Sequence, residues 1–174
     1  LITYFAGYQE LAYVLGDKER ELLFRMTPAA YDSDIAWWGQ SLATAAFQVG
    51  DLKRARAYAD SSLATAKQQS DASPKDPQLR ALYAVTLAYV GRGADANREM
   101  AQAIADAPAG SGLNESYVRL QAVRMHLALG EQVPVGDGDH PVAGGLQADL
   151  VLAAHVAAHE GKHPLAVGLG DEQV

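Results

Sequence analysis

The sequence contains no cysteine, which excludes disulfide bonds, thiolate metal sites and cysteine nucleophiles together. It also has no excess of basic residues, because 14 lysines and arginines stand against 21 aspartates and glutamates, for a formal charge of −7 at pH 7. No basic cluster is dense enough to follow a phosphate backbone, so we expect no nucleic-acid partner. No apolar run reaches the roughly 18 residues of a membrane span, and we expect no membrane insertion of this segment.

Alanine, by contrast, is abundant. It accounts for 33 of the 174 residues, and 49% of the chain is hydrophobic, which indicates a folded rather than a disordered protein. The alanines fall in segments of helical rather than strand periodicity. Because small side chains allow helices to approach closely, this composition favours a protein built of packed helices.

The segment DIAWWGQSLATAAFQVG predicts one helix, with Asp34 as its N-cap and Gly50 at its end. A second helix is predicted to begin directly afterwards, with Asp51 as its N-cap. Two helices joined at such a Gly-Asp corner form an antiparallel hairpin. The inward face expected for the second helix consists of Leu52, Ala55, Ala59, Ser62, Leu63 and Ala66.

The same pattern recurs further along the chain. A helix is predicted from Asp76 as N-cap, with Pro77 at the first helical position, to Gly91. Its partner helix is predicted to end at Pro108. The residues of this partner expected to face inward are Ala96, Met100, Ala103 and Ile104.

A third round is predicted to open at Asn114 and to close at Gly130. The corner glycines at positions 50, 91 and 130 are 41 and 39 residues apart, a spacing typical of a stacked helical repeat. An earlier and weaker copy of the pattern turns at Gly16. We therefore predict an all-α fold without a β-sheet, in which antiparallel helix hairpins form a right-handed stack.

At these residues the chain resembles the tetratricopeptide repeat (TPR) family. The resemblance depends on a small residue seven positions before the corner glycine, an alanine five positions after it and a proline seventeen positions after it. The residues that match are Ala43 and Ala55 around Gly50, and Ala84, Ala96 and Pro108 around Gly91. The resemblance implies a right-handed superhelical solenoid over residues 1–131 that acts as a non-catalytic scaffold for protein–protein interaction.

Within that family, the run from Tyr4 to about Gly130 is most similar to the repeat regions of bacterial Ser/Thr kinases and related signalling regulators. This similarity implies a regulatory module of a larger bacterial signalling protein, in either a cytoplasmic or an extracytoplasmic domain. The sequence has neither a glycine-rich kinase loop nor a His-Arg-Asp or Asp-Phe-Gly triplet. Kinase activity is therefore not implied.

The resemblance also implies where a partner binds. In proteins of this family the first helix of each pair lines a concave groove, and residues two, five and nine places into it point toward a bound peptide or helical segment. The positions expected here are Trp37, Gln40, Thr44, Phe47, Gln78, Val85, Tyr117 and Arg124. Aromatic and amide groups dominate this set, and a single arginine is too little for a clamp that recognises a C-terminal carboxylate. The alternative is that Trp37 and Phe47 only pack against the preceding hairpin.

The C-terminal part of the chain departs from this pattern. Residues 132–145 hold four glycines and two prolines, which indicates a linker. Residues 146–174 are predicted to form a degenerate helical hairpin, because Gly161 has the same relation to its neighbouring alanines as the earlier corner glycines.

That last segment also contains His159, Glu160 and His163, which spell the His-Glu-x-x-His pattern of zinc metalloproteases. A zinc-dependent hydrolase would need both histidines on one helical turn, the glutamate as general base and a third protein ligand. A glycine inside the motif and a proline directly after it disfavour that turn. We interpret the motif as a repeat corner with surface histidines and expect neither a cofactor nor catalysis, with the hydrolase as the alternative. Metal binding by these two histidines and His155, without catalysis, also stays open.

Overall fold

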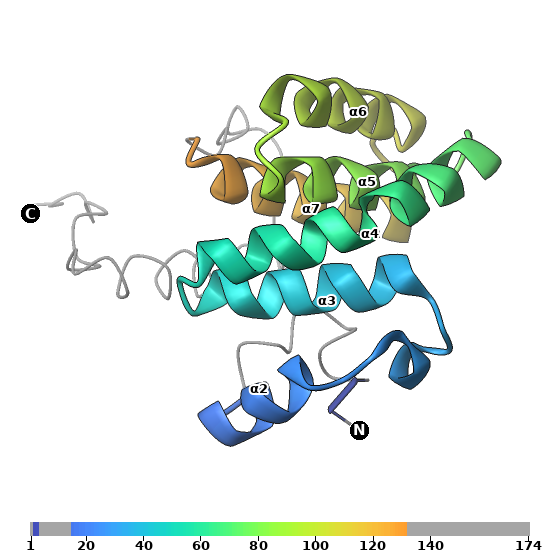
Figure 1. The fold of residues 1–174 in the computed structure, drawn as a ribbon. Helices are drawn as coiled ribbons and strands as arrows, with labels where there is room; N and C mark the ends of the chain where they lie inside the picture. Colours follow the sequence, from blue (N-terminus) through green and yellow to red (C-terminus); the bar gives the residue numbers. More distant parts are fainter. Residues whose placement is uncertain (1, 4–14, 132–174) are drawn as a thin grey trace, which may run out of the picture.

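The computed structural model describes residues 2–3 and 15–131 of the chain, and this part is helical throughout (Figure 1). It contains no β-strand, and six α-helices lie wholly within residues 15–131, so the predicted all-α class is confirmed for the described residues. The elements are α2 (Asp17–Phe24), the 3-10 helix η2 (Pro28–Tyr31), α3 (Ile35–Gln48), α4 (Leu52–Ala72), α5 (Pro77–Tyr89), α6 (Gly93–Asp106) and α7 (Leu113–Leu129).

The predicted corners at Gly50, Gly91 and Gly130 share one backbone geometry. All three glycines have a positive φ, of 76°, 81° and 69°. This is the left-handed region that glycine enters at the least cost, so each position suits a helix C-terminus. After each glycine the next amide donates to a carbonyl five residues back, for example from Asp51 N to Ala46 O at 3.0 Å, which is the bond of a Schellman motif. The recurrence seen in the sequence is therefore a recurrence of one helix-ending motif.

The predicted N-caps of three helices are also confirmed. The Asp34 carboxylate accepts from Trp37 N at 2.9 Å, and that of Asp51 accepts from Arg54 N at 3.0 Å. The Asp76 carboxylate accepts from the amides of the second and third residues of α5. Each bond satisfies a backbone donor that a helix start leaves unpaired.

Two predicted boundaries are wrong. Helix α7 begins at Leu113 after Gly112, one residue before the predicted opening at Asn114, whose side chain instead accepts a hydrogen bond from Gln78 Nε2 at 2.8 Å. Gly16 is not a corner of the same kind, because its φ is −70° and it lies at the N-cap of α2. The residues directly before it, 4–14, lie outside the described part.

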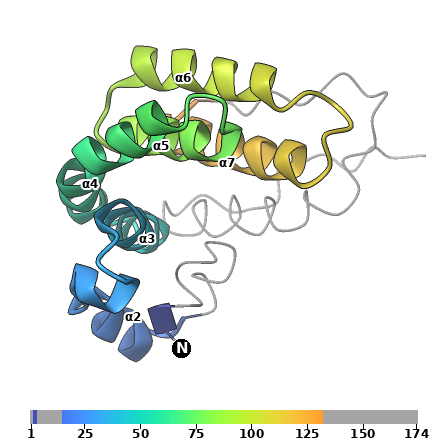
Figure 2. The same ribbon diagram turned by 90° about the vertical axis from the view of Figure 1, so that its right-hand side faces the viewer.

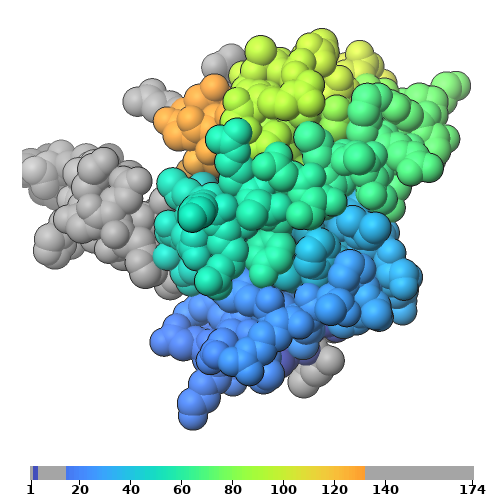
Figure 3. Space-filling view, viewed as in Figure 1, coloured from blue at the N-terminus to red at the C-terminus, as the bar shows by residue number. Residues whose placement is uncertain are grey.

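The helices pack in sequence order as hairpins. Helix α3 packs on α4, α4 on α5, and α5 on both α6 and α7, and the two views agree on this order (Figures 1 and 2). The space-filling view runs from the N-terminal helices at the bottom to α6 at the top (Figure 3). Small residues lie at the centre of the α3–α4 and α5–α6 hairpins, since Ala43 and Ala84 are fully buried. Because these side chains are small, the backbones of the two helices in each hairpin can approach closely.

Two residues predicted to face inward lie outside instead. Leu52 is 61% exposed and Ile104 is 48% exposed. Leu52 is the first residue of α4, beside the corner, where the neighbouring helix has already ended. Helix α6 lies at the top of the described stack (Figure 2), and Ile104 lies in its second half. The spacing of Leu52 and Ile104 is helical, but both side chains are exposed within the described residues.

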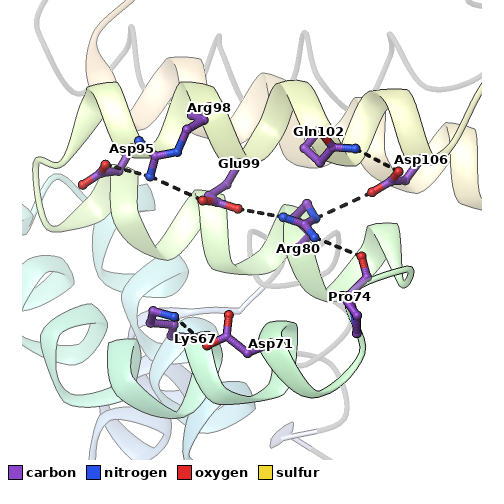
Figure 4. Close-up of polar contacts among 9 residues, drawn as sticks. All are labelled: Lys67, Asp71, Pro74, Arg80, Asp95, Arg98, Glu99, Gln102 and Asp106. Atoms are coloured by element: carbon purple, nitrogen blue, oxygen red, sulfur yellow. Dashed lines mark hydrogen bonds and ion pairs between the residues drawn. The ribbon is translucent and has the colours of Figure 1, made fainter.

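An ion-pair network holds α6 to the start of α5 (Figure 4). Arg80 Nη1 lies 3.0 Å from Glu99 Oε2, and its Nη2 donates to the Pro74 carbonyl at 2.9 Å. Arg80 Nε lies 3.7 Å from Asp106 Oδ2, which is an ion pair rather than a hydrogen bond. The Arg80 side chain is only 19% exposed, so it joins two helices and the loop before α5 in a partly desolvated position.

Candidate functional site

Two hollows lie where α3, α5 and α7 meet. These three are the first helices of the three rounds in the sequence. Six of the eight residues predicted to face a partner line one hollow or the other. Trp37, Gln40 and Tyr117 line the first hollow, and Thr44, Phe47 and Arg124 line the second.

The first hollow has a volume of about 230 Å³. Its wall contains Trp37 and Gln40 of α3 and Tyr117 of α7. The remaining lining residues are Asp34, Ala36, Ala66, Gln69, Leu79 and Leu82. Side chains from four helices and one helix cap thus line a space with both apolar and polar walls.

The first hollow's aromatic wall is held by the N-terminal segment. The Trp37 ring makes an edge-to-face contact with Tyr31 of η2, with ring centroids 5.1 Å apart. Tyr31 is itself fully buried, and burial raises the pKa of its hydroxyl to about 12, with the nearby Ser41 hydroxyl acting in the opposite direction. The Tyr31 hydroxyl nevertheless makes no hydrogen bond of ordinary geometry. The indole of Trp37 is therefore supported by packing, while it stays half-buried beside the hollow.

The polar groups of the first hollow differ in how well they are satisfied. The Asp34 carboxylate caps α3 and also accepts from Gln69 Nε2 at 3.1 Å. Gln40 is 4% exposed, and among residues 2–3 and 15–131 its Nε2 has no hydrogen-bond partner. Buried polar groups in proteins are nearly always paired, and this amide is one of the few buried side-chain groups of the described residues without such a bond.

The second hollow is much smaller, with a volume of about 10 Å³. The Tyr89 hydroxyl donates to Thr44 Oγ1 at 3.4 Å, and the Tyr89 ring packs on Phe47 with centroids 5.5 Å apart. Burial raises the pKa of Tyr89, and the hydrogen bond with Thr44 opposes this shift. Arg124 is 4% exposed and donates to Gln121 Oε1 at 3.5 Å. This hollow is a polar seam between helices, with little room for a ligand.

The other two predicted residues, Gln78 and Val85, line neither hollow. Gln78 is half-buried and its side-chain amide bonds to Asn114 of α7. Val85 is fully buried in the main core, so it has no surface that a partner can reach. The packing alternative holds in part: Trp37 contacts the preceding segment through Tyr31, whereas Phe47 contacts the following pair through Tyr89.

Some lining residues were not predicted. Gln69 comes from α4, the second helix of its pair. On α5, Leu82 lies between the two chosen positions, and Tyr89 lies one turn after the second. The sequence did contain a signal for one further buried polar residue, Gln121 of α7. Gln121 is fully buried and interrupts the apolar stripe of Val118 and Met125. A polar side chain at such spacing marks a buried polar contact.

The His-Glu-x-x-His motif and His155 lie outside the described residues, so their arrangement is not placed. Within residues 2–3 and 15–131 no group of three or more metal-ligating side chains comes together. In the same part of the chain, no helix has the length and apolar character needed to cross a membrane.

Compared with known proteins, the chain matches no family model, no curated protein and no solved structure. The resemblance to TPR proteins therefore stays a prediction from the sequence.

Proposed function

We propose that this chain is a TPR-like scaffold that binds an extended segment of a protein partner on the face formed by α3, α5 and α7. We further propose that it serves as a regulatory module of a larger bacterial signalling protein, without catalytic activity of its own. The observation that carries the proposal is the first hollow, where Trp37 and Gln40 of α3 lie around one space with Tyr117 of α7, although these two helices are far apart in the sequence.

The chemistry of this face suits a peptide. Trp37 and Tyr117 are both half-buried, so each offers a ring that is fixed by its neighbours and still has accessible surface. Aromatic residues of this kind often contribute about 2 kcal/mol or more to a protein interface. A peptide that crosses the face would also meet polar side chains, which fix its orientation.

The proposal is tested with peptides selected for binding. A random peptide library would be panned on the purified chain, and the affinities of the selected peptides would be measured by fluorescence anisotropy. We expect Trp37→Ala and Tyr117→Ala to weaken binding at least tenfold while the helical circular dichroism stays unchanged.

The control is Arg56→Glu, because Arg56 is exposed on α4, the second helix of its pair. Normal binding by both aromatic variants, together with loss of binding in Arg56→Glu, would show that a different face is used.

A further inference from the structure

We infer that the first hollow is a subsite for an uncharged, apolar residue of the bound segment, and that a backbone carbonyl of this segment accepts a hydrogen bond from Gln40 Nε2. This inference rests on the proposed function, because it names the chemistry of one position within the proposed face.

The donor is the first argument. Gln40 is only 4% exposed, and it lines the hollow. Within the described part of the chain its Nε2 makes no hydrogen bond, so no such bond of this group ties α3 to a neighbouring helix. A buried donor that lacks a partner is costly, and a ligand that brings an acceptor removes this cost on binding.

The shape and lining of the hollow are the second argument. Apart from the two aromatic rings, four of the remaining residues are aliphatic: Ala36, Ala66, Leu79 and Leu82. These side chains come from α3, α4 and α5, so the apolar wall surrounds the space rather than forming one flat side. An aromatic or aliphatic side chain of the ligand is favoured here, since burial of apolar surface and ring contacts both stabilise it.

Charge narrows the class of ligand further. Among the described residues, the lining includes one carboxylate, that of Asp34, and no lysine or arginine. Both oxygens of this carboxylate already accept hydrogen bonds from the protein. A ligand carboxylate in this hollow would lie near the negatively charged Asp34, and water would screen the repulsion only weakly. The hollow therefore suits an internal residue of a peptide and disfavours the C-terminal residue with its carboxylate.

The test uses two small probes that differ in one group. N-acetyl-phenylalaninamide presents an apolar ring with neutral amides, whereas N-acetyl-phenylalanine carries a carboxylate at pH 7. Binding is followed by NMR chemical-shift changes of the indole N–H of Trp37. We expect the neutral probe to bind and the charged probe to bind at least tenfold more weakly. Equal affinities would contradict the charge argument, and no shift with the neutral probe would overturn the subsite.

The variant that tests the donor is Gln40→Met, because methionine is of similar length and has no N–H. We expect this variant to melt at the same or a higher temperature than the parent and to bind the neutral probe at least tenfold more weakly. The matched control is Gln102→Met, since Gln102 is exposed on α6, away from the hollow. Unchanged affinity in Gln40→Met would refute the hydrogen bond, and a lowered melting temperature would show that the amide is structural.

The peptide experiment separates this inference from the proposed function. If selected peptides depend on Trp37 but are unaffected by Gln40→Met, the face binds peptides and the subsite is wrong. If no selected peptide depends on Trp37 or Tyr117, the proposed function fails, and the probe titrations still decide whether the hollow takes an uncharged amide ligand.

Discussion

A close contact between α3 and α4 gives a sharp prediction at Gly39. A Cβ added to Gly39 of α3 would lie 2.4 Å from Ser62 Cβ and 2.9 Å from the backbone oxygen of Tyr58, both on α4. Carbon atoms normally pack at about 3.5–4.0 Å. Because one of the two neighbours is a helix backbone, the clash is relieved only by moving α3 and α4 apart. We therefore predict that Gly39→Ala is destabilising.

The magnitude follows from two opposing terms. Overpacking a tight core typically costs about 1–3 kcal/mol, and the contact with backbone places Gly39 near the upper end. Replacing glycine by alanine inside a helix returns roughly 1 kcal/mol. The expected net loss is about 2 kcal/mol in the free energy of unfolding, measured by urea denaturation followed at 222 nm.

The matched control is Gly93→Ala. A Cβ at Gly93 would lie 3.4 Å from Leu129 Cδ2, close to ordinary contact, so this variant is expected to be as stable as the parent or slightly more stable. If Gly39→Ala is as stable as Gly93→Ala, the close packing of α3 on α4 is refuted.

Three further substitutions test the packing. Ala84→Leu should cost about 1–3 kcal/mol by overpacking, because Ala84 is fully buried, while Ala57→Leu at an exposed site of α4 should change stability by less than about 0.5 kcal/mol; equal thermal stability would refute the register. Arg80→Met should lower the free energy of unfolding by about 1–3 kcal/mol, since it removes the partly buried cation between Glu99 and Asp106, of which Glu99 keeps only its 3.4 Å pair with Arg98; Arg119→Met, which removes a guanidinium that is 52% exposed, should change it by less than about 0.5 kcal/mol. Tyr31→Phe removes a buried hydroxyl that makes no hydrogen bond of ordinary geometry within the described residues, so stability at pH 7 should be unchanged or higher. The folded pKa of Tyr31, about 12, lies above its ordinary value of 10.0, so the fold disfavours the ionised hydroxyl, and the free energy of unfolding falls as the pH rises from 10 toward 12. Tyr31→Phe should lose less stability than the parent over that range, and an identical alkaline loss would contradict this origin.

Most of the helix boundaries could be predicted because they depend on local chemistry, whereas those expected at Gly16 and Asn114 are wrong. Asp34, Asp51 and Asp76 cap the helices that follow them, and the glycines at three corners take the left-handed conformation. Exposure could not be predicted in the same way. Leu52 and Ile104 have the periodicity of buried residues, and their exposure depends on which neighbours are present.

The candidate site was likewise predictable only in part from the sequence. Positions taken from the resemblance to TPR proteins include three residues that line the first hollow. The same counting included Val85, which is fully buried because α5 packs closely along α6 and α7. The unpaired amide of Gln40 and the tight contact at Gly39 required the structure, since both depend on distances between helices.

Photo-crosslinking of a selected peptide tests the central claim most directly. A benzophenone side chain would be placed at the apolar position of the peptide, and the residues of the protein that it attaches to would be identified by mass spectrometry. Binding on the proposed face predicts crosslinks at Trp37, Gln40 and Tyr117. Crosslinks confined to exposed residues of α4 and α6 such as Arg56 and Arg98 would contradict it.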